Sequence, residues 1–254
     1  MSKLVRSLIA DVFELAFYQK GKIAITSETL TDGDIEVKVS KNEVKGGRGN
    51  FKIATLHSGR DINVKCTDPC FDYNILALNL GQDVVVGSGI AHCMTRKYEV
   101  KKASLGEKLS ITLEEAPLNS KEIEIYYKGE KLTVTTDYTI TTKAVEFTGD
   151  KVKEHDNVTV RPYSYESDED AERISINANT YAEGGKLVLE TLEKDTNEKA
   201  IARIQYVFPS AQPAGDFTVS TKSEVKESPT PLEFSINKPD DSDEIGYILR
   251  IPIK

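Results

Sequence analysis

Runs in which apolar and polar residues alternate with a period of two recur through most of this chain of 254 residues. A strand with one buried and one solvated face has this pattern, because successive side chains of an extended backbone point to opposite faces of a sheet. The runs 34–40, 51–57 and 61–66 show it early in the chain, and 186–192 and 232–236 show it near the end. The chain is therefore predicted to be mainly β.

Two β-hairpins are predicted in the first part of the chain. The first joins 22–26 to 34–40 through a turn at 31–34, and the second spans 51–66 with a turn at 58–60. The polar, glycine-rich stretch between them is too long for a tight turn and is expected to be an extended, mobile loop. Its residues are Lys41, Asn42, Glu43, Val44, Lys45, Gly46, Gly47, Arg48, Gly49 and Asn50.

One short helix is predicted after the second hairpin. Asp68 is a suitable N-cap, Pro69 suits the first helical position, and Gly81 is expected to end the helix. The segment 4–18 has an apolar pattern that fits either a short helix or an arm docked on a neighbour.

The spacing of the strand-like runs changes near Ser104. From 109 to 165 short alternating runs recur at intervals of roughly ten residues, which is typical of a small β-sandwich. The acidic run 166–170 is expected to be a solvated return linker. The predicted organisation is one host domain, 1–103 with 167–254, interrupted by an inserted domain, 104–166. Further host strands are expected at 173–179, 186–192, 200–208, 216–225, 232–236 and 246–253.

Composition limits the possible partners and compartments. The 41 acidic and 33 basic residues give a net charge of −8, which disfavours a protein that grips nucleic acid. No apolar run approaches the roughly 20 residues that span a bilayer, so no membrane insertion is expected. Acidic Asp11 and Glu14 follow the start closely, which predicts a cytosolic product without a signal peptide. The three cysteines are an odd number in a long chain, which argues against a disulfide framework, so free thiols are expected.

The residues that could bind a metal or phosphate do not have the required spacing. Cys66, Cys70, His92 and Cys93 are the only grouping of soft ligands, and buried thiols are favoured over a zinc site because a strand end and a helix start do not form a zinc knuckle. The glycines of 46–50 lack the Lys-Ser/Thr ending of a phosphate loop and precede a strand.

Calcium and catalytic sites are disfavoured for similar reasons. Asp240, Asp241, Asp243 and Glu244 lack the glycine and distal glutamate of a calcium loop, so a solvated turn is favoured. His57, His92 and His155 have no nucleophile suitably spaced, and no serine lies in a nucleophile elbow. No catalytic, cofactor or metal site is predicted, and the chain is not expected to be an enzyme.

Several stretches, taken in their order, resemble a known family. A glycine-rich stretch before a strand, a strand pair, a short helix and a set of carboxy-terminal strands are similar to the major tail tube proteins of tailed bacteriophages, and two further stretches look like the immunoglobulin-like insertion of some members. The stretches are 46–50, 60–64, 68–71 and 76–81, then 201–211, 216–221 and 232–236, with 137–140 and 157–163 in the insertion.

The resemblance implies a tail-tube-type β-sandwich or barrel with an immunoglobulin-like insertion. Hexameric rings would stack into a hollow tube whose inner wall is a continuous β-barrel, and genomic DNA would pass through without specific binding. The implied location is the virion tail, after synthesis in the host cytoplasm, and no cofactor is implied. The implied partners are other copies of the chain, a tape measure, a terminator, a baseplate and, in a contractile tail, a sheath.

The resemblance also implies functions for the expected loop 41–50 and for one face of the predicted strand 34–40. The expected loop 41–50 carries Lys41, Lys45 and Arg48 and is predicted to contact the next ring. Asp34, Glu36, Lys38 and Ser40 share one face of a predicted strand and are expected to line the lumen, although their charges are mixed in sign. The alternative is an ordinary solvated face of a monomer.

A second class of function stays open at this point. A surface- or carbohydrate-binding β-sandwich module, such as a receptor-binding or decoration protein, would need exposed aromatic side chains against which a sugar can stack. The chain contains no tryptophan, which weakens this alternative.

Overall fold

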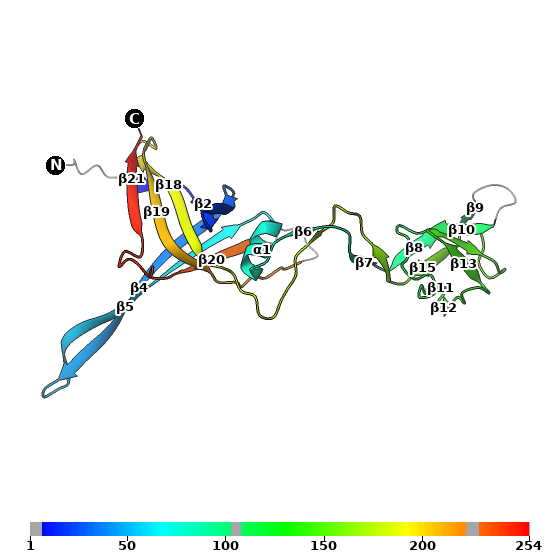
Figure 1. The fold of residues 1–254 in the computed structure, drawn as a ribbon, viewed down its shortest axis with the longest axis horizontal. Helices are drawn as coiled ribbons and strands as arrows, with labels where there is room; N and C mark the ends of the chain where they lie inside the picture. Colours follow the sequence, from blue (N-terminus) through cyan, green and yellow to red (C-terminus); the bar gives the residue numbers. More distant parts are fainter. Residues whose placement is uncertain (1–6, 103–107, 222–228, 254) are drawn as a thin grey trace. The chain divides into compact units, whose positions relative to one another are not determined.

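The computed structural model describes residues 7–102, 108–221 and 229–253, and strands make up most of the ordered elements (Figure 1). The prediction of a mainly β chain is confirmed. The chain divides into two compact units. Unit 1 combines Met1–Val84 with Ile174–Lys254, and unit 2 is Val85–Arg173.

Unit 1 is built on one antiparallel sheet. Its elements are β1 (Ser7–Ile9), β2 (Glu14–Gln19), β3 (Lys22–Ser27), β4 (Asp32–Gly46), β5 (Phe51–Asp68), α1 (Tyr73–Leu80), β18 (Gly185–Asp195), β19 (Ala200–Pro213), β20 (Thr230–Ile236) and β21 (Tyr247–Pro252). The main strand order is β3-β2-β18-β19-β20-β5-β4, while β1 also pairs with β18 and β21 with β19. Among the described strands this path is open at both ends, so the unit is not a closed barrel.

The core of unit 1 follows from the alternation of its central strands. Leu187 and Leu189 of β18 and Leu232 of β20 are completely buried. The rings of Phe17 and Phe234 pack with their centroids 5.1 Å apart. Burying such side chains stabilises the fold by roughly 1.5–3 kcal/mol each.

The amino-terminal segment forms strands, so its interpretation as a helix is wrong over residues 7–18. Residues 4–6 lie outside the described part of the chain. Leu15 and Phe17 are buried at alternate positions of β2, a period of two that a helix cannot bury on one face. β2 turns into β3 at Lys20 and Gly21, which both have positive φ angles of 50° and 77°, as in a two-residue hairpin turn.

The predicted pairing of 22–26 with 34–40 is also wrong. β3 pairs with β2, whereas β4 pairs along its whole length with β5. The alternation correctly predicted that these segments are strands. It could not predict which strands pair, because each strand has an apolar face that would suit several partners.

The stretch 41–50 is not an extended loop. β4 continues to Gly46, and only Gly47–Asn50 form a turn before β5 begins at Phe51. The turn expected at 58–60 is instead a β-bulge. Ser40 is opposite Gly59 and Lys41 is opposite His57, which leaves Ser58 as the additional residue.

Helix α1 begins later than predicted. Asp72 is the N-cap and accepts a hydrogen bond from the Asn74 amide. Asp68 is instead buried at the end of β5, where Ser27, Thr29 and the Cys70 amide donate to its carboxylate. Gly81 ends the helix as predicted, with a left-handed φ of 63°, and a Cβ there would lie 2.2 Å from the Tyr181 carbonyl oxygen.

Unit 2 contains two four-stranded antiparallel sheets, β13-β14-β10-β9 and β12-β11-β15-β8, that share one apolar core. Tyr138 is completely buried there and donates a hydrogen bond to the Ile123 carbonyl. The strands are β6 (Val85–Val86), β7 (Ile90–Cys93), β8 (Arg96–Glu99), β9 (Lys101–Lys102), β10 (Leu109–Thr112), β11 (Ile125–Tyr127), β12 (Glu130–Lys131), β13 (Tyr138–Thr141), β14 (Ala144–Phe147), β15 (Asn157–Val160), β16 (Tyr163–Glu166) and β17 (Glu172–Arg173).

This unit is longer at both ends than the predicted insertion 104–166. β8 pairs with β15, and the two chain segments at the ends of the unit pair with each other, β6 with β17 and β7 with β16. These pairings are long-range in sequence, so the change of spacing near Ser104 could not reveal them.

Two of the expected host strands are not formed as predicted. β17 ends at Arg173, so 174–179 is not a strand, and 216–221 has no strand either. Residues 222–225 lie outside the described part of the chain. The other expected host strands are present, as β18, β19, β20 and β21.

Candidate assembly surface

One exposed apolar feature of unit 1 is the outer part of the β4–β5 hairpin. This part, 37–62, is called the arm below, and Figure 1 shows it projecting from the sheet of unit 1. Large apolar side chains on it are exposed, among them Phe51 (72%), Ile53 (68%) and Leu56 (57%). Monomeric proteins rarely expose contiguous apolar surface of this kind unless it binds something.

The register of the arm shows that its apolar face changes sides along its length. Near the sheet, Val37 is opposite Ile62 and shares a face with Val39, while Lys38 and Asp61 lie on the other face. Beyond the bulge at Ser58, the face that carried Lys38 instead carries Leu56 and Val44, and the face that carried Val37 carries Lys41 and Glu43. The arm therefore offers apolar side chains on both faces.

The tip of the arm is basic in an acidic protein. Residues 41–52 contain four cations, Lys41, Lys45, Arg48 and Lys52, and one anion, Glu43. Glu43 pairs with Lys52 at 2.8 Å and with Lys45 at 3.6 Å. All these side chains are exposed, so the pairs contribute little to the stability of the monomer. Arg48 and Lys41 form no ion pair within the described residues, which leaves them available to another chain.

Asp34, Glu36, Lys38 and Ser40 all lie on one face of β4 and are exposed. Lys38 Nζ is 2.9 Å from Glu36 Oε2, so this face is locally near neutral. On the opposite face only Ile35 packs against the core, whereas Val37 and Val39 are exposed. The expectation that Asp34, Glu36, Lys38 and Ser40 line a lumen stays a prediction.

Two further exposed strands were not singled out by the sequence patterns. β1 pairs with β18 and β21 pairs with β19, so the strands lie at opposite edges of a four-stranded part of the sheet. Leu8 and Ile9 of β1 are exposed, as are Ile248 and Leu249 of β21. Their alternation resembles that of any half-buried strand, and only the tertiary structure shows which side chains stay uncovered.

The cysteines do not form a ligand cluster. Cys66 and Cys70 belong to unit 1 and Cys93 to unit 2, and all three thiols are free. Burial raises the pKa of the Cys66 thiol to about 12, which leaves it protonated and unreactive near neutral pH. Within the described ranges, no group of three or more histidine, cysteine or acidic residues is arranged to hold a metal ion.

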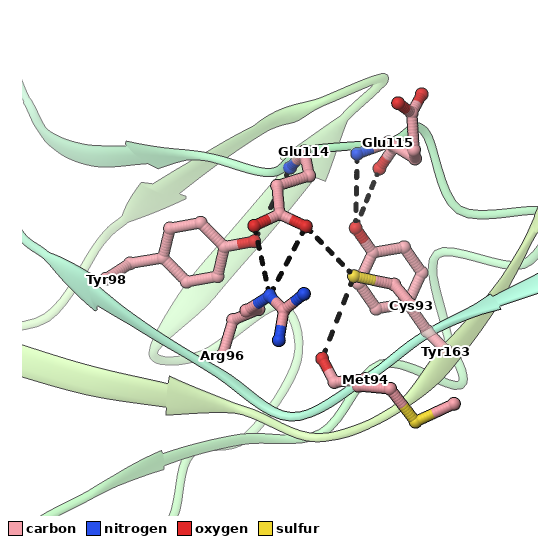
Figure 2. A network of polar contacts seen from close by, with 7 residues as sticks. All are labelled: Cys93, Met94, Arg96, Tyr98, Glu114, Glu115 and Tyr163. Carbon is pink, nitrogen blue, oxygen red and sulfur yellow. Dashed lines mark hydrogen bonds and ion pairs between the residues drawn. The ribbon is translucent and has the colours of Figure 1, made fainter. Parts of the chain in front are cut away.

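Cys93 takes part in a polar network in unit 2 (Figure 2). Its Sγ lies 3.7 Å from Glu114 Oε2, and the Arg96 guanidinium Nε lies 3.1 Å from Glu114 Oε1. Tyr163 donates a hydrogen bond to the Glu115 carbonyl at 3.0 Å. Burial raises the pKa of Tyr163, so it stays a neutral donor. The network fastens the segment after β10 to β8 and β16, and it contains no nucleophile activated by a base.

Within the described part of the chain, no helix is long and apolar enough to cross a membrane. A mainly β chain with a projecting hairpin and apolar sheet edges has the features of a structural protein that contacts other protein chains.

Comparison with known proteins places the chain in a family. It matches the model of the YomU/Tube protein family over residues 7–251. It is also 23% identical over 251 residues to a tail tube protein of Bacillus phage SPR, an alignment that covers 96% of this chain and 89% of that protein. The chain belongs to the YomU/Tube protein family. The resemblance to phage tail tube proteins is confirmed, and with it a structural rather than an enzymatic role.

Proposed function

We propose that copies of this chain form rings that stack into a phage tail tube, the conduit through which the genome enters the host. Membership of the YomU/Tube family and the similarity to a tail tube protein support this role. Six copies per ring is the number that the resemblance implies. The further partners proposed are a tape measure, a terminator, a baseplate and, in a contractile tail, a sheath.

The arm is the single observation that carries the proposal. Fully burying a large apolar side chain contributes roughly 1.5–3 kcal/mol, whereas association of two proteins costs about 4–15 kcal/mol in lost freedom and ordering. Burial of the exposed side chains of Phe51, Ile53 and Leu56 would therefore supply a free energy comparable to that cost. In a monomer the same side chains would only promote unspecific aggregation, so a defined partner surface is expected.

The edges β1 and β21 supply a second kind of contact. Because they are different strands at opposite edges, pairing of β1 in one copy with β21 in the next would be a heterologous contact, which closes into a ring when the rotation between copies allows it. Such pairing would also cover exposed Leu8, Ile9 and Leu249. It would remove the free strand edges that otherwise invite aggregation.

The charge of the chain fits a conduit for DNA. A net charge of −8 disfavours binding to phosphates, so DNA would pass without being held. We propose that Asp34, Glu36, Lys38 and Ser40 face the lumen. Since Lys38 pairs with Glu36, the negative potential of the lumen must come from other surfaces as well.

Negative-stain electron microscopy of the purified protein over a range of concentrations tests the proposal. Rings or hollow tubes are expected above a critical concentration, and monomers below it. Monomers at every concentration, together with binding to a glycan array, would overturn the proposal in favour of a carbohydrate-binding module.

A further inference from the structure

We propose that the tip of the arm of one copy docks in an apolar groove at the base of the arm of the next copy, beside an acidic turn. This inference rests on the proposed self-assembly and names the surface that receives the arm. It is carried by three observations on unit 1: the groove, the turn and the length of the arm.

The groove has a volume of about 400 Å³ and lies where the arm leaves the sheet. Its lining is mainly apolar and comes from β4, β5, β19 and β21 and from the residues just before β2 and β21, including Phe13, Val37, Ile62, Tyr206, Tyr247 and Ile248. The rings of Phe13 and Tyr206 meet edge to face with centroids 5.7 Å apart. Small-molecule pockets of about 300–1,000 Å³ enclose drug-sized ligands, so a groove of this size accepts an aromatic side chain such as Phe51.

The turn that leads into β21 is acidic and exposed. Residues 238–244 contain four anions, Asp240, Asp241, Asp243 and Glu244, and one cation, Lys238. Lys238 Nζ is 2.5 Å from Asp243 Oδ1, while the other three carboxylates form no ion pair within the described residues. Only Ile245 separates the turn from Gly246, which lines the groove with Tyr247 and Ile248, so the turn is close to the groove along the chain.

The two surfaces complement each other in sign and in chemistry. The tip has three more cations than anions over residues 41–52, and the turn has three more anions than cations over residues 238–244. The tip also carries the exposed ring of Phe51, and the groove offers exposed apolar walls. Opposite charges around an apolar contact steer the encounter and fix its register.

The arm is too long for the tip to fill the groove of its own chain. Gly46 at the tip lies nine positions beyond Val37, which lines the groove. An extended strand rises about 3.3 Å per residue, or roughly 30 Å over this length. β4 and β5 are paired over this whole length, which holds the arm extended. A second copy of the chain is therefore the occupant whose tip fits the groove.

Charge reversal with rescue tests the docking. Lys45→Glu with Arg48→Glu is expected to raise the critical concentration for tubes at least about tenfold, and high salt should weaken wild-type assembly. Adding Asp241→Lys and Asp243→Lys to the same chain should restore assembly to within about threefold of wild type. Lys97→Glu with Lys121→Glu, two exposed lysines of unit 2, is the control with the same change of charge and should assemble normally.

Disulfide trapping locates the contact. In a Cys70→Ser background, one batch carries Arg48→Cys and another carries Asp243→Cys, so that mild oxidation of the mixture should link the two kinds of chain. A third batch with Tyr181→Cys, an exposed position outside both surfaces, should not link to Arg48→Cys. Normal tubes from the charge-reversed variant, or failure of the second reversal to rescue, would overturn the docking alone. Absence of wild-type assemblies at any concentration would instead overturn the proposed function.

Discussion

Val37 of β4 lies opposite Ile62 of β5, and yet 53% of Val37 is exposed. Val64, one apolar pair closer to the sheet on the same face, is completely buried. The core of unit 1 thus ends at the pair of Val37 and Ile62, of which Ile62 still packs against it, while the apolar alternation continues outward along the arm. The described residues of unit 1 leave the side chains of this outer alternation largely exposed, which is why we assign them to contacts between copies.

A matched pair of substitutions separates the two roles of this face. Val37→Ala should change the free energy of unfolding by about 0.5 kcal/mol or less, because the side chain is already half exposed. The same change should raise the critical concentration for tubes several-fold, because a contact between copies is lost. Val64→Ala should lower the free energy of unfolding by at least about 1 kcal/mol. Equal destabilisation by the two variants in urea unfolding would contradict this division.

Shortening the arm should abolish stacking without unfolding the chain. Ser40 and Gly59 lie opposite each other, so replacing 41–58 with an Asn-Gly turn closes the hairpin at a paired position. Circular dichroism should report an unchanged melting temperature, and electron microscopy should find no tubes. Tubes of normal length from the shortened chain would show that the arm is not required.

The buried carboxylate of Asp68 predicts a dependence of stability on pH. Burial alone would raise the pKa of Asp68, but hydrogen bonds from Ser27, the Cys70 amide and Thr29 outweigh it and lower the pKa below its ordinary value. Because the folded pKa is the lower one, the stabilisation is complete above the ordinary pKa of about 4 and is lost as the pH falls through the folded value.

Asp68→Asn measures this contribution, because one amide oxygen cannot accept from all three donors. At pH 7 the variant should unfold with a free energy about 1–3 kcal/mol below wild type, as expected for hydrogen bonds to a charged group. The difference should begin to narrow below about pH 4, where the unfolded wild type takes up a proton, and should narrow further until the folded carboxylate is protonated at its lower pKa. Urea unfolding from pH 3 to pH 7 checks this, and a difference that stays constant with pH would count against an ionised Asp68.

Removal of unit 2 should leave unit 1 folded. Val85 and Arg173 are paired across β6 and β17, and paired residues lie about 5 Å apart, so two or three Gly/Ser residues can join Val84 to Ile174. We expect the deleted chain to unfold in one cooperative transition and to form tubes that lack the mass of unit 2. Loss of cooperative unfolding would mean that the two units depend on each other.

The mainly β character could be predicted from the amino-acid sequence alone, as could the end of α1 at Gly81 and most strands of both units. These are local properties, since alternation and a left-handed glycine act over a few neighbouring residues. The family resemblance likewise rested on stretches that can be read one after another along the chain.

The pairing of the strands, and with it the conformation of the stretch 41–50, could be seen only in the folded chain. β4 pairs with β5 rather than with β3. Because of this pairing, residues 41–50 form the tip of a hairpin rather than the predicted loop. Strand pairing joins residues far apart in sequence, and several strands offered equally suitable faces. The exposure of Val37, Phe51 and Ile248 could not be predicted from the sequence either. A strand face that is buried within the chain and one that binds another chain have the same alternation of apolar and polar residues.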